Sequence, residues 1–135
     1  MSTFPLKIVT PDGLIYDGEA TQLIVRTITG DMAVLARHIN CVAALGMGRA
    51  TLIDGTGARR YAAGIGGILS VVNGEVTLVP TTFEWAESID AARAQLSQER
   101  AEKVLKDSSA SSTDVKLAEA RLHRALVRKS VASYK

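Results

Sequence analysis

The sequence contains one cysteine, two histidines and few aromatic residues, and each shortage excludes a class of function. Cys41 cannot form an internal disulfide, which fits a reducing cytoplasm. His38 and His123 are too few and too far apart in the sequence to form a zinc site by themselves, so we expect no metal. Aromatic residues make up only 4% of the chain and do not interleave with the arginines, so we expect no nucleic-acid partner.

Long hydrophobic runs are also lacking. No segment approaches the roughly 20 apolar residues of a membrane-spanning helix, and the first residues show no cationic stretch followed by an apolar run. We therefore expect any membrane association to come through a partner. The net charge is only +2, but it is unevenly placed, because residues 114–135 hold six Lys/Arg and two Asp/Glu. The basic excess lies in this last segment.

Residues 1–82 have the pattern of an all-β domain. Short runs of Val, Ile, Leu and Thr alternate with Gly, Asp and Asn, and no helix-length amphipathic segment occurs. The clearest hairpin joins residues 68–72 to residues 75–79 through Asn73-Gly74, the pair that a two-residue type I′ turn favours. In that register one face of the hairpin belongs to the core and the other is less apolar. The pattern predicts a β-sandwich or a flattened barrel.

The composition changes to good helix formers after Pro80. We predict one helix from a cap at Ser88 or Asp90 to about Lys106, and a second from a cap within residues 111–113 to about Val131. The sequence therefore predicts an α+β fold, with an antiparallel β-sandwich over residues 1–84 and an antiparallel two-helix hairpin over residues 85–135. We expect the helices to pack through the following apolar residues: Ile89, Ala92, Leu96, Ala118, Leu122 and Ala125.

Arginines recur at helical spacing on both predicted helices. Arg93 and Arg100 are seven residues apart, and Arg121, Arg124 and Arg128 follow at i, i+3 and i+7, so each set lies on one helix face. An antiparallel hairpin would bring the two sets together, and their repulsion favours a bound multivalent anion or an acidic partner. The alternative is a solvated charged face. In that alternative the positive charge is reduced by nearby carboxylates, those of Glu99, Glu102 and Glu119.

Several motifs occur in a specific order along the chain. They occupy residues 9–13 and 16–19, residues 30–45, residues 67–71 before the Asn-Gly turn, and residues 89–94. In this order and spacing the chain resembles the epsilon subunit of the bacterial F-type ATP synthase over essentially its whole length. The resemblance implies a ten-stranded β-sandwich and a mobile two-helix domain. It also implies a non-catalytic central-stalk subunit on the cytoplasmic face of the plasma membrane, with a proton or sodium ion as the coupling ion.

The resemblance implies two uses of the helices and one of the sandwich. A folded hairpin would bind ATP as a regulatory ligand, without any required cofactor. The base and ribose would be surrounded by Glu84, Ile89, Asp90 and Ala94. The phosphates would be bound by Arg93, Arg100, Arg124 and Arg128. An extended second helix would inhibit hydrolysis by contacting acidic segments of the alpha and beta subunits through Arg121, Arg124, Arg128 and Lys129. The gamma subunit and the c ring would be contacted by a sandwich surface that includes Asp31 and His38.

Two local features depart from simple expectations. Residues 36–40 lack both prolines that flank the corresponding histidine in many relatives, which predicts a less rigid loop. Residues 64–67 are glycine-rich like a phosphate loop but lead into a hairpin instead of a helix, so we expect no nucleotide there.

No nucleophile with a base and an orienting carboxylate is recognisable, so we expect no enzymatic activity. The alternative to a rotor and regulatory subunit is a self-contained ATP-binding sensor module.

Overall fold

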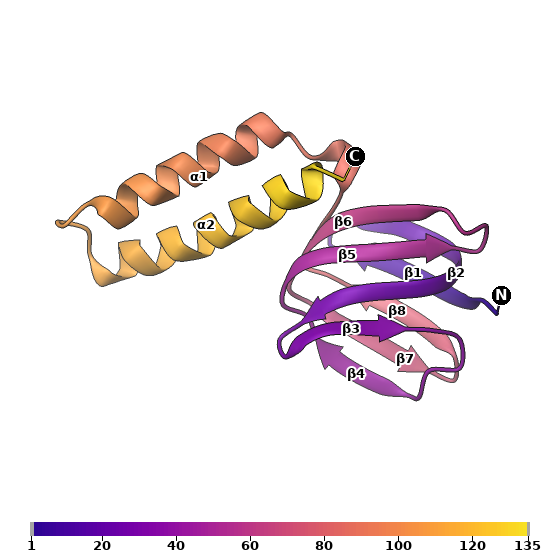
Figure 1. The fold of residues 1–135 in the computed structure, drawn as a ribbon. Coiled ribbons are helices and arrows are strands. Elements are labelled where there is room, and N and C mark those ends of the chain that lie inside the picture. The colour runs from indigo at the N-terminus through magenta and orange to yellow at the C-terminus, as the bar shows by residue number, and fades with distance from the viewer. Residues whose placement is uncertain (1, 135) are drawn as a thin grey trace. The chain divides into compact units, whose positions relative to one another are not determined.

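The computed structural model describes residues 2–134 and divides into two compact units (Figure 1). The first extends to Trp85 and consists of strands, and the second begins at Ala86 and consists of helices. The predicted α+β fold class is confirmed. The predicted boundary lies between residues 84 and 85, one residue before this division. Within residues 2–134, no helix is both long enough and apolar enough to cross a membrane.

Nine strands form the first unit in the described part of the chain, one fewer than the resemblance implied. They are β1 (Phe4–Thr10), β2 (Gly13–Thr27), β3 (Gly30–Val34), β4 (Cys41–Ala44), β5 (Met47–Asp54), β6 (Arg59–Ile65), β7 (Ile68–Val72), β8 (Glu75–Val79) and β9 (Thr82–Trp85). They follow the order β4-β7-β8-β1-β2-β5-β6-β9, and β3 pairs with β2. The pairing is antiparallel except between β1 and β8, which run parallel.

The long strand β2 turns this single sheet into a sandwich (Figure 1). Its first part pairs with β1, and its second part pairs with both β5 and β3, so it belongs to both layers. Alternate residues of the strands point inward, and Leu6, Ile8, Leu23, Leu52 and Leu78 are almost fully buried. Each such side chain contributes about 1.5–3 kcal/mol relative to an exposed one. The core of the sandwich therefore consists of large aliphatic side chains.

The predicted β7–β8 hairpin is confirmed in its register and its turn. Leu69 pairs with Leu78 and Val71 with Val76, and all four side chains are buried. Asn73 and Gly74 have φ angles of 50° and 82°, the left-handed conformation that a type I′ turn requires at both positions. The glycine-rich residues 64–67 form the end of β6 and its connection to β7, so a strand and not a helix follows them.

The second unit contains a short 3-10 helix, η1 (Ala86–Ser88), and two α-helices, α1 (Ala91–Lys106) and α2 (Ser112–Ala132). The Asp90 carboxylate caps α1 by accepting a hydrogen bond from the Arg93 amide at 3.1 Å. The Ser111 hydroxyl caps α2 in the same way with the Asp114 amide, also at 3.1 Å. Both predicted caps are confirmed. The helices lie side by side and run antiparallel (Figure 1).

The predicted inner face of α1 is partly wrong. Ala94 and Ala101 are the buried residues of α1, whereas Ala92 is exposed and Leu96 is 52% exposed. Two residues along a helix correspond to a rotation of about 200°, so Leu96 points away from the side on which Ala94 lies. On α2 the predicted Ala118 and Ala125 are buried. The helices pack through alanines, because small residues let the two backbones approach closely.

Candidate functional site

A groove of about 710 Å³ runs between α1 and α2. Its volume falls within the range of about 300–1,000 Å³ that is typical of small-molecule sites. The lining includes Ser97, Val104 and Leu117. It also includes five arginines, namely Arg93, Arg100, Arg121, Arg124 and Arg128. The arginines on the two helices, separated in the sequence by up to 35 positions, therefore border one cavity as the helical spacing predicted.

Arginine and lysine are distributed differently around this groove. All five arginines within residues 86–134 line it. The four lysines of the same segment do not, and these are Lys103, Lys106, Lys116 and Lys129. A guanidinium group offers a planar fork of donors that matches a phosphate or carboxylate, whereas an ammonium group acts as a point charge. This distribution is more typical of a binding site for a phosphate or carboxylate than of a surface that only carries positive charge.

Four of the five groove arginines have no carboxylate partner within the described residues. Among residues 2–134, the side chains of Arg93, Arg100, Arg121 and Arg124 form no ion pair. The three carboxylates of the alternative interpretation, those of Glu99, Glu102 and Glu119, do not line the groove. Positive charge is therefore available there for a ligand.

The end of the groove near the interhelical turn has the opposite character. Asp107 and Asp114 line it, with Val104 and Leu117 in the same part of the groove. The hydroxyl of Ser109 donates to the Asp107 carboxylate at 2.7 Å and its amide donates at 2.9 Å, and these bonds lower the Asp107 pKa. The carboxylate is thereby kept ionised. The groove is positive along most of its length and negative at the turn.

The residues expected around the base and ribose do not line the groove. Ile89 and Ala94 are buried and do not line the groove, and the Asp90 carboxylate is occupied as the α1 cap. Glu84 belongs to β9 of the first unit, where it pairs with Ala63. The four arginines expected at the phosphates line the groove, and Arg121 joins them. The helical spacing had already placed Arg121 in the arginine set that favours an anion, although the family resemblance gave it only an inhibitory role.

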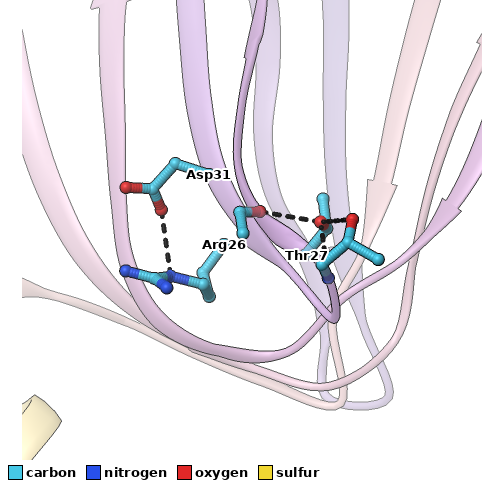
Figure 2. Close-up of polar contacts among 5 residues, drawn as sticks. Arg26, Thr27 and Asp31 are labelled. Carbon is cyan, nitrogen blue, oxygen red and sulfur yellow. Dashed lines mark hydrogen bonds and ion pairs between the residues drawn. The ribbon is translucent and has the colours of Figure 1, made fainter.

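Asp31 lies at the start of β3, directly after the turn from β2 (Figure 2). Its carboxylate forms an ion pair with the Arg26 guanidinium at 3.0 Å, and 59% of the Asp31 side chain is exposed. Arg26 and Asp31 face each other across the β2–β3 register. The hydroxyl of Thr27 donates to the carbonyl of Gly30 at 2.7 Å, which fixes the turn. Asp31 is thus exposed on a well-ordered part of the sheet.

The Arg26 side chain lies flat against the neighbouring strand because Gly48 leaves room for it. A Cβ atom at position 48 would approach the Arg26 Cβ to 2.7 Å, which is closer than real contacts allow. Only glycine permits this close approach. The backbone of β5 therefore helps to hold the Arg26–Asp31 pair in place.

The structure does not bring His38 next to Asp31. His38 follows the other end of β3, in residues 35–40, so the length of the strand separates the two. Its Nδ1 atom lies 2.8 Å from the carbonyl of Ile39 and 3.9 Å from the Cys41 sulfur. The described residues contain no group of three His, Cys, Asp or Glu side chains that could hold a metal ion. Despite the missing prolines, the loop is anchored, because Asn40 accepts a hydrogen bond from the Asn73 amide at 2.8 Å.

An exposed apolar sheet face was missed in the sequence analysis. Val42 of β4 is 71% exposed, and Ile68, Val72 and Val79 of the adjacent β7 and β8 are exposed on the same side. The sequence signal was present, because residues 68–72 carry apolar side chains at both alternating positions, whereas a strand with one solvated face should alternate. A cluster of exposed apolar residues on one sheet face is typical of a surface that binds another protein.

The fold and its surfaces define a class of protein: a β-sandwich with an exposed apolar face, followed by a helical hairpin with an arginine-lined groove. The family described as "ATP synthase, Delta/Epsilon chain, beta-sandwich domain" matches residues 3–86, and its "long alpha-helix domain" matches residues 87–133. The chain belongs to this ATP synthase family and groups with its bacterial epsilon chains. The family resemblance inferred from the sequence is confirmed.

Relatives match this chain over nearly their whole length. The ATP synthase epsilon chain of Bacillus cytotoxicus is 40% identical over 135 residues, which is 100% of both chains. That of Bacillus velezensis is 41% identical over 132 residues, which is 98% of each chain. That of Shouchella clausii is 36% identical over 135 residues, covering 100% of this chain and 98% of the relative.

Two solved structures share the fold at low sequence identity. A chain in the mitochondrial ATP synthase of Euglena gracilis superposes with a TM-score of 0.86 at 21% identity, covering 100% of this chain and 83% of that chain. A chain in the central stalk and c ring of the Tetrahymena thermophila enzyme superposes with a TM-score of 0.66 at 10% identity, and 95% of each chain is covered.

Proposed function

We propose that this chain is a non-catalytic central-stalk subunit that joins the catalytic head of an F-type ATP synthase to its membrane c ring and inhibits ATP hydrolysis through its helices. One observation carries the proposal: the chain combines an exposed apolar sheet face with a separate helical unit whose arginines all border one groove. The first surface serves assembly, and the second serves regulation. The chain would lie peripherally on the cytoplasmic face of the bacterial plasma membrane, held there by its partners.

The sandwich provides the assembly surfaces in this proposal. The apolar face of β4, β7 and β8 binds the gamma subunit, because an apolar surface of this kind is stabilised when a partner removes it from water. Asp31 lies near the start of β3 and His38 lies beyond its end, so the two contact different parts of the rotor. Asp31, exposed beside Arg26, contacts the c ring, and His38 extends the surface around residues 35–40.

The helices provide the regulatory surfaces. ATP binds in the groove between α1 and α2 with its phosphates on the arginines, and the extended α2 contacts acidic segments of the alpha and beta subunits. Three of the four residues expected to inhibit, Arg121, Arg124 and Arg128, line the groove. The fourth, Lys129, lies outside it and donates to Gln98 at 3.3 Å. ATP and the catalytic head therefore compete for the same guanidinium groups.

Reconstitution of the assembled synthase tests this function. A chain truncated after residue 84 should still join the rotor and support coupled synthesis, while the rate of ATP hydrolysis rises.

A full-length chain with Arg121, Arg124, Arg128 and Lys129 all replaced by Ala should incorporate normally, and the assembled enzyme should also hydrolyse ATP faster. Added salt should narrow its difference from the parent, because exposed ion pairs are screened over roughly 10 Å at 0.1 M. Failure of the truncated chain to join the rotor, with its sandwich still folded, would contradict the assembly role.

A self-contained ATP sensor is the second candidate function. The observation in its favour is that the groove is lined entirely by residues of the second unit, so ligand binding there requires no partner. Affinity purification of the chain from its native membrane distinguishes the two. Recovery of the other synthase subunits supports the rotor role, and recovery of a lone chain that binds ATP supports the sensor.

A further inference from the structure

We propose that Arg60 and Trp85 form a latch that fastens the last strand of the sheet, β9, to β6, and that this latch sets how much of the chain can move with the helices. A closed latch ends the fixed part of the first unit at Trp85. An open latch would release residues 82–85 as additional tether. The latch rests on contacts within the first unit alone, whereas its regulatory consequence rests on the proposed function.

The strand β9 needs more than its backbone pairing to stay in the sheet. It has four residues and stands at one end of the strand order, so β6 is its one neighbour among the described strands. A short pair of strands is marginally stable unless side chains support it. Phe83 pairs with Gly64. Trp85 pairs with Ala62, so neither partner on β6 offers a large side chain.

The two aromatic rings of β9 compensate for these small partners. Phe83 and Trp85 are two positions apart on one face of the strand and meet edge to face, with ring centroids 5.0 Å apart and planes at 88°. A Cβ atom at position 64 would lie 3.9 Å from the Phe83 ring, so this ring covers the glycine. Both rings also pack against the buried core of the sandwich. Aromatic contacts thus replace the cross-strand pairs that glycine and alanine cannot supply.

Arg60 completes the contact from the neighbouring strand. It lies two residues before Ala62 on the same face of β6, so it is diagonal to Trp85 in the sheet. Its guanidinium carbon lies 3.6 Å from the centroid of the Trp85 ring, which is close enough for the cation to stack on the indole. Trp85 is the last residue of β9, whereas β6 is also paired with β5. The contact therefore joins the end of an edge strand to a strand that β5 already holds.

The chain is also held just before β9, at a point that opening of the latch would not reach. Pro80 is almost fully buried, and the Thr81 amide donates to the carbonyl of Ile65 at 3.1 Å. Release of β9 would thus free the four residues that follow Thr81. Extended chain spans about 3.3 Å per residue, so the tether would lengthen by about 13 Å. A flexible tether longer than its span requires lowers the effective concentration of the helices at their target.

Two measurements on the full chain, without nucleotide or partners, test the latch. Trp85 is the only tryptophan of the sequence, so quenching of its fluorescence by acrylamide reports its exposure directly. Hydrogen–deuterium exchange followed by NMR reports the opening of residues 82–85. Arg60→Ala should increase the quenching and speed exchange of these amides by about three- to thirtyfold, the range expected for loss of a cation–π contact. Exchange in β4, at the other end of the strand order, should stay as in the parent.

Two matched variants separate the stacked guanidinium from net charge. Arg60→Lys keeps the positive charge without the planar group and should restore only part of the protection. Arg59→Ala removes one positive charge from an exposed position of the same strand and should behave like the parent in both measurements. Thermal denaturation followed by circular dichroism confirms that each variant is folded.

The reconstituted synthase tests the regulatory consequence. Arg60→Ala should incorporate normally, because the latch lies outside the apolar face of β4, β7 and β8. The assembled enzyme should hydrolyse ATP faster than the parent, but more slowly than an enzyme that carries the chain truncated after residue 84. Arg59→Ala should match the parent.

The outcomes distinguish this inference from the proposed function. Equal quenching and exchange in Arg60→Ala and Arg59→Ala would overturn the latch. Opening of β9 in Arg60→Ala with unchanged hydrolysis, when the truncated chain does raise hydrolysis, would overturn the regulatory consequence alone. If the truncated chain does not raise hydrolysis either, the proposed inhibition fails together with that consequence, and the latch then stands or falls on the measurements with the free chain.

Discussion

The sandwich and the helical hairpin are held together in different ways. The sandwich buries large side chains such as Leu6, Ile8, Leu23 and Leu78, whereas the contact between α1 and α2 buries alanines. Three of the leucines on the helices, Leu96, Leu117 and Leu126, are exposed, and Val131 near the end of α2 is the larger apolar residue that is buried. Burial of apolar surface stabilises in proportion to area, so the helix pair gains much less from packing than the sandwich does.

Charge increases the difference between the two units. The sandwich places Arg26 against Asp31, whereas the hairpin gathers five arginines around one groove. Bringing these like charges together opposes the weak packing of the alanines. A bound polyanion would remove that opposition. The sandwich is therefore held by large aliphatic side chains, whereas the packing of the hairpin relies on small side chains and is opposed by like charge.

The largest expected effect is the loss of a core side chain from the sandwich. Leu23→Ala should lower the free energy of unfolding by about 2–5 kcal/mol, since it removes buried methyl groups and leaves a cavity. The matched control is Leu96→Ala on the exposed side of α1, for which we expect less than about 0.5 kcal/mol. Urea denaturation followed by circular dichroism measures both. Equal losses would show that the helices contribute as much packing as the sandwich.

The next effect concerns the proposed binding of ATP in the groove between α1 and α2. Arg93→Ala and Arg128→Ala should each weaken ATP binding by about one to two decades, because a hydrogen bond to a charged group contributes about 1.5–3 kcal/mol. Lys106→Ala, an exposed charge outside the groove, is the control and should bind like the parent. Isothermal titration gives the affinities. Unchanged binding in both arginine variants would leave the groove without a role in binding ATP.

A smaller effect is expected from adding bulk between the helices. Ala118→Leu should cost about 1–3 kcal/mol of hairpin stability by forcing α1 and α2 apart, and it should weaken ATP binding with them. Ala120→Leu places the same side chain on the exposed side of α2 and should change neither property. Thermal denaturation with and without ATP measures the difference. If the two variants behave alike, the alanine contact is not what holds the groove in shape.

Features fixed by local chemistry were predictable from the sequence. The Asn73-Gly74 turn and the Asp90 and Ser111 caps depend on residues within three positions of one another, and all are found as expected. The inner face of α1 was not predictable in the same way. Leu96 is the larger apolar residue, but the helices pack through Ala94, because a close approach of backbones needs small side chains.

The candidate site was predictable only in part for a related reason. Helical periodicity placed the arginines on one face, and they line one groove. Periodicity could not show that Ala94 would be buried in the packing of the helices, nor that Glu84 would pair within a strand. The Arg26–Asp31 pair depends on the register of β2 with β3 and on the space above Gly48. Such contacts depend on how neighbouring strands pair and pack, so the residue pattern within one strand does not predict them.

The smallest expected effect separates the cap of α1 from its ligand. Asp90→Ala removes the acceptor of the Arg93 amide and should lower the stability of the hairpin by about 1 kcal/mol, while the sandwich is unaffected. Asp90→Asn keeps a capping oxygen and should retain most of that stability. If Asp90 acts only as a cap, ATP affinity should follow helix stability, and the Asn variant should bind ATP like the parent. Titration with ATP and circular dichroism on the same samples test this. An Asn variant with full helix content but weakened ATP binding would show that the carboxylate contacts the ligand, and the nucleoside would then lie at the start of α1.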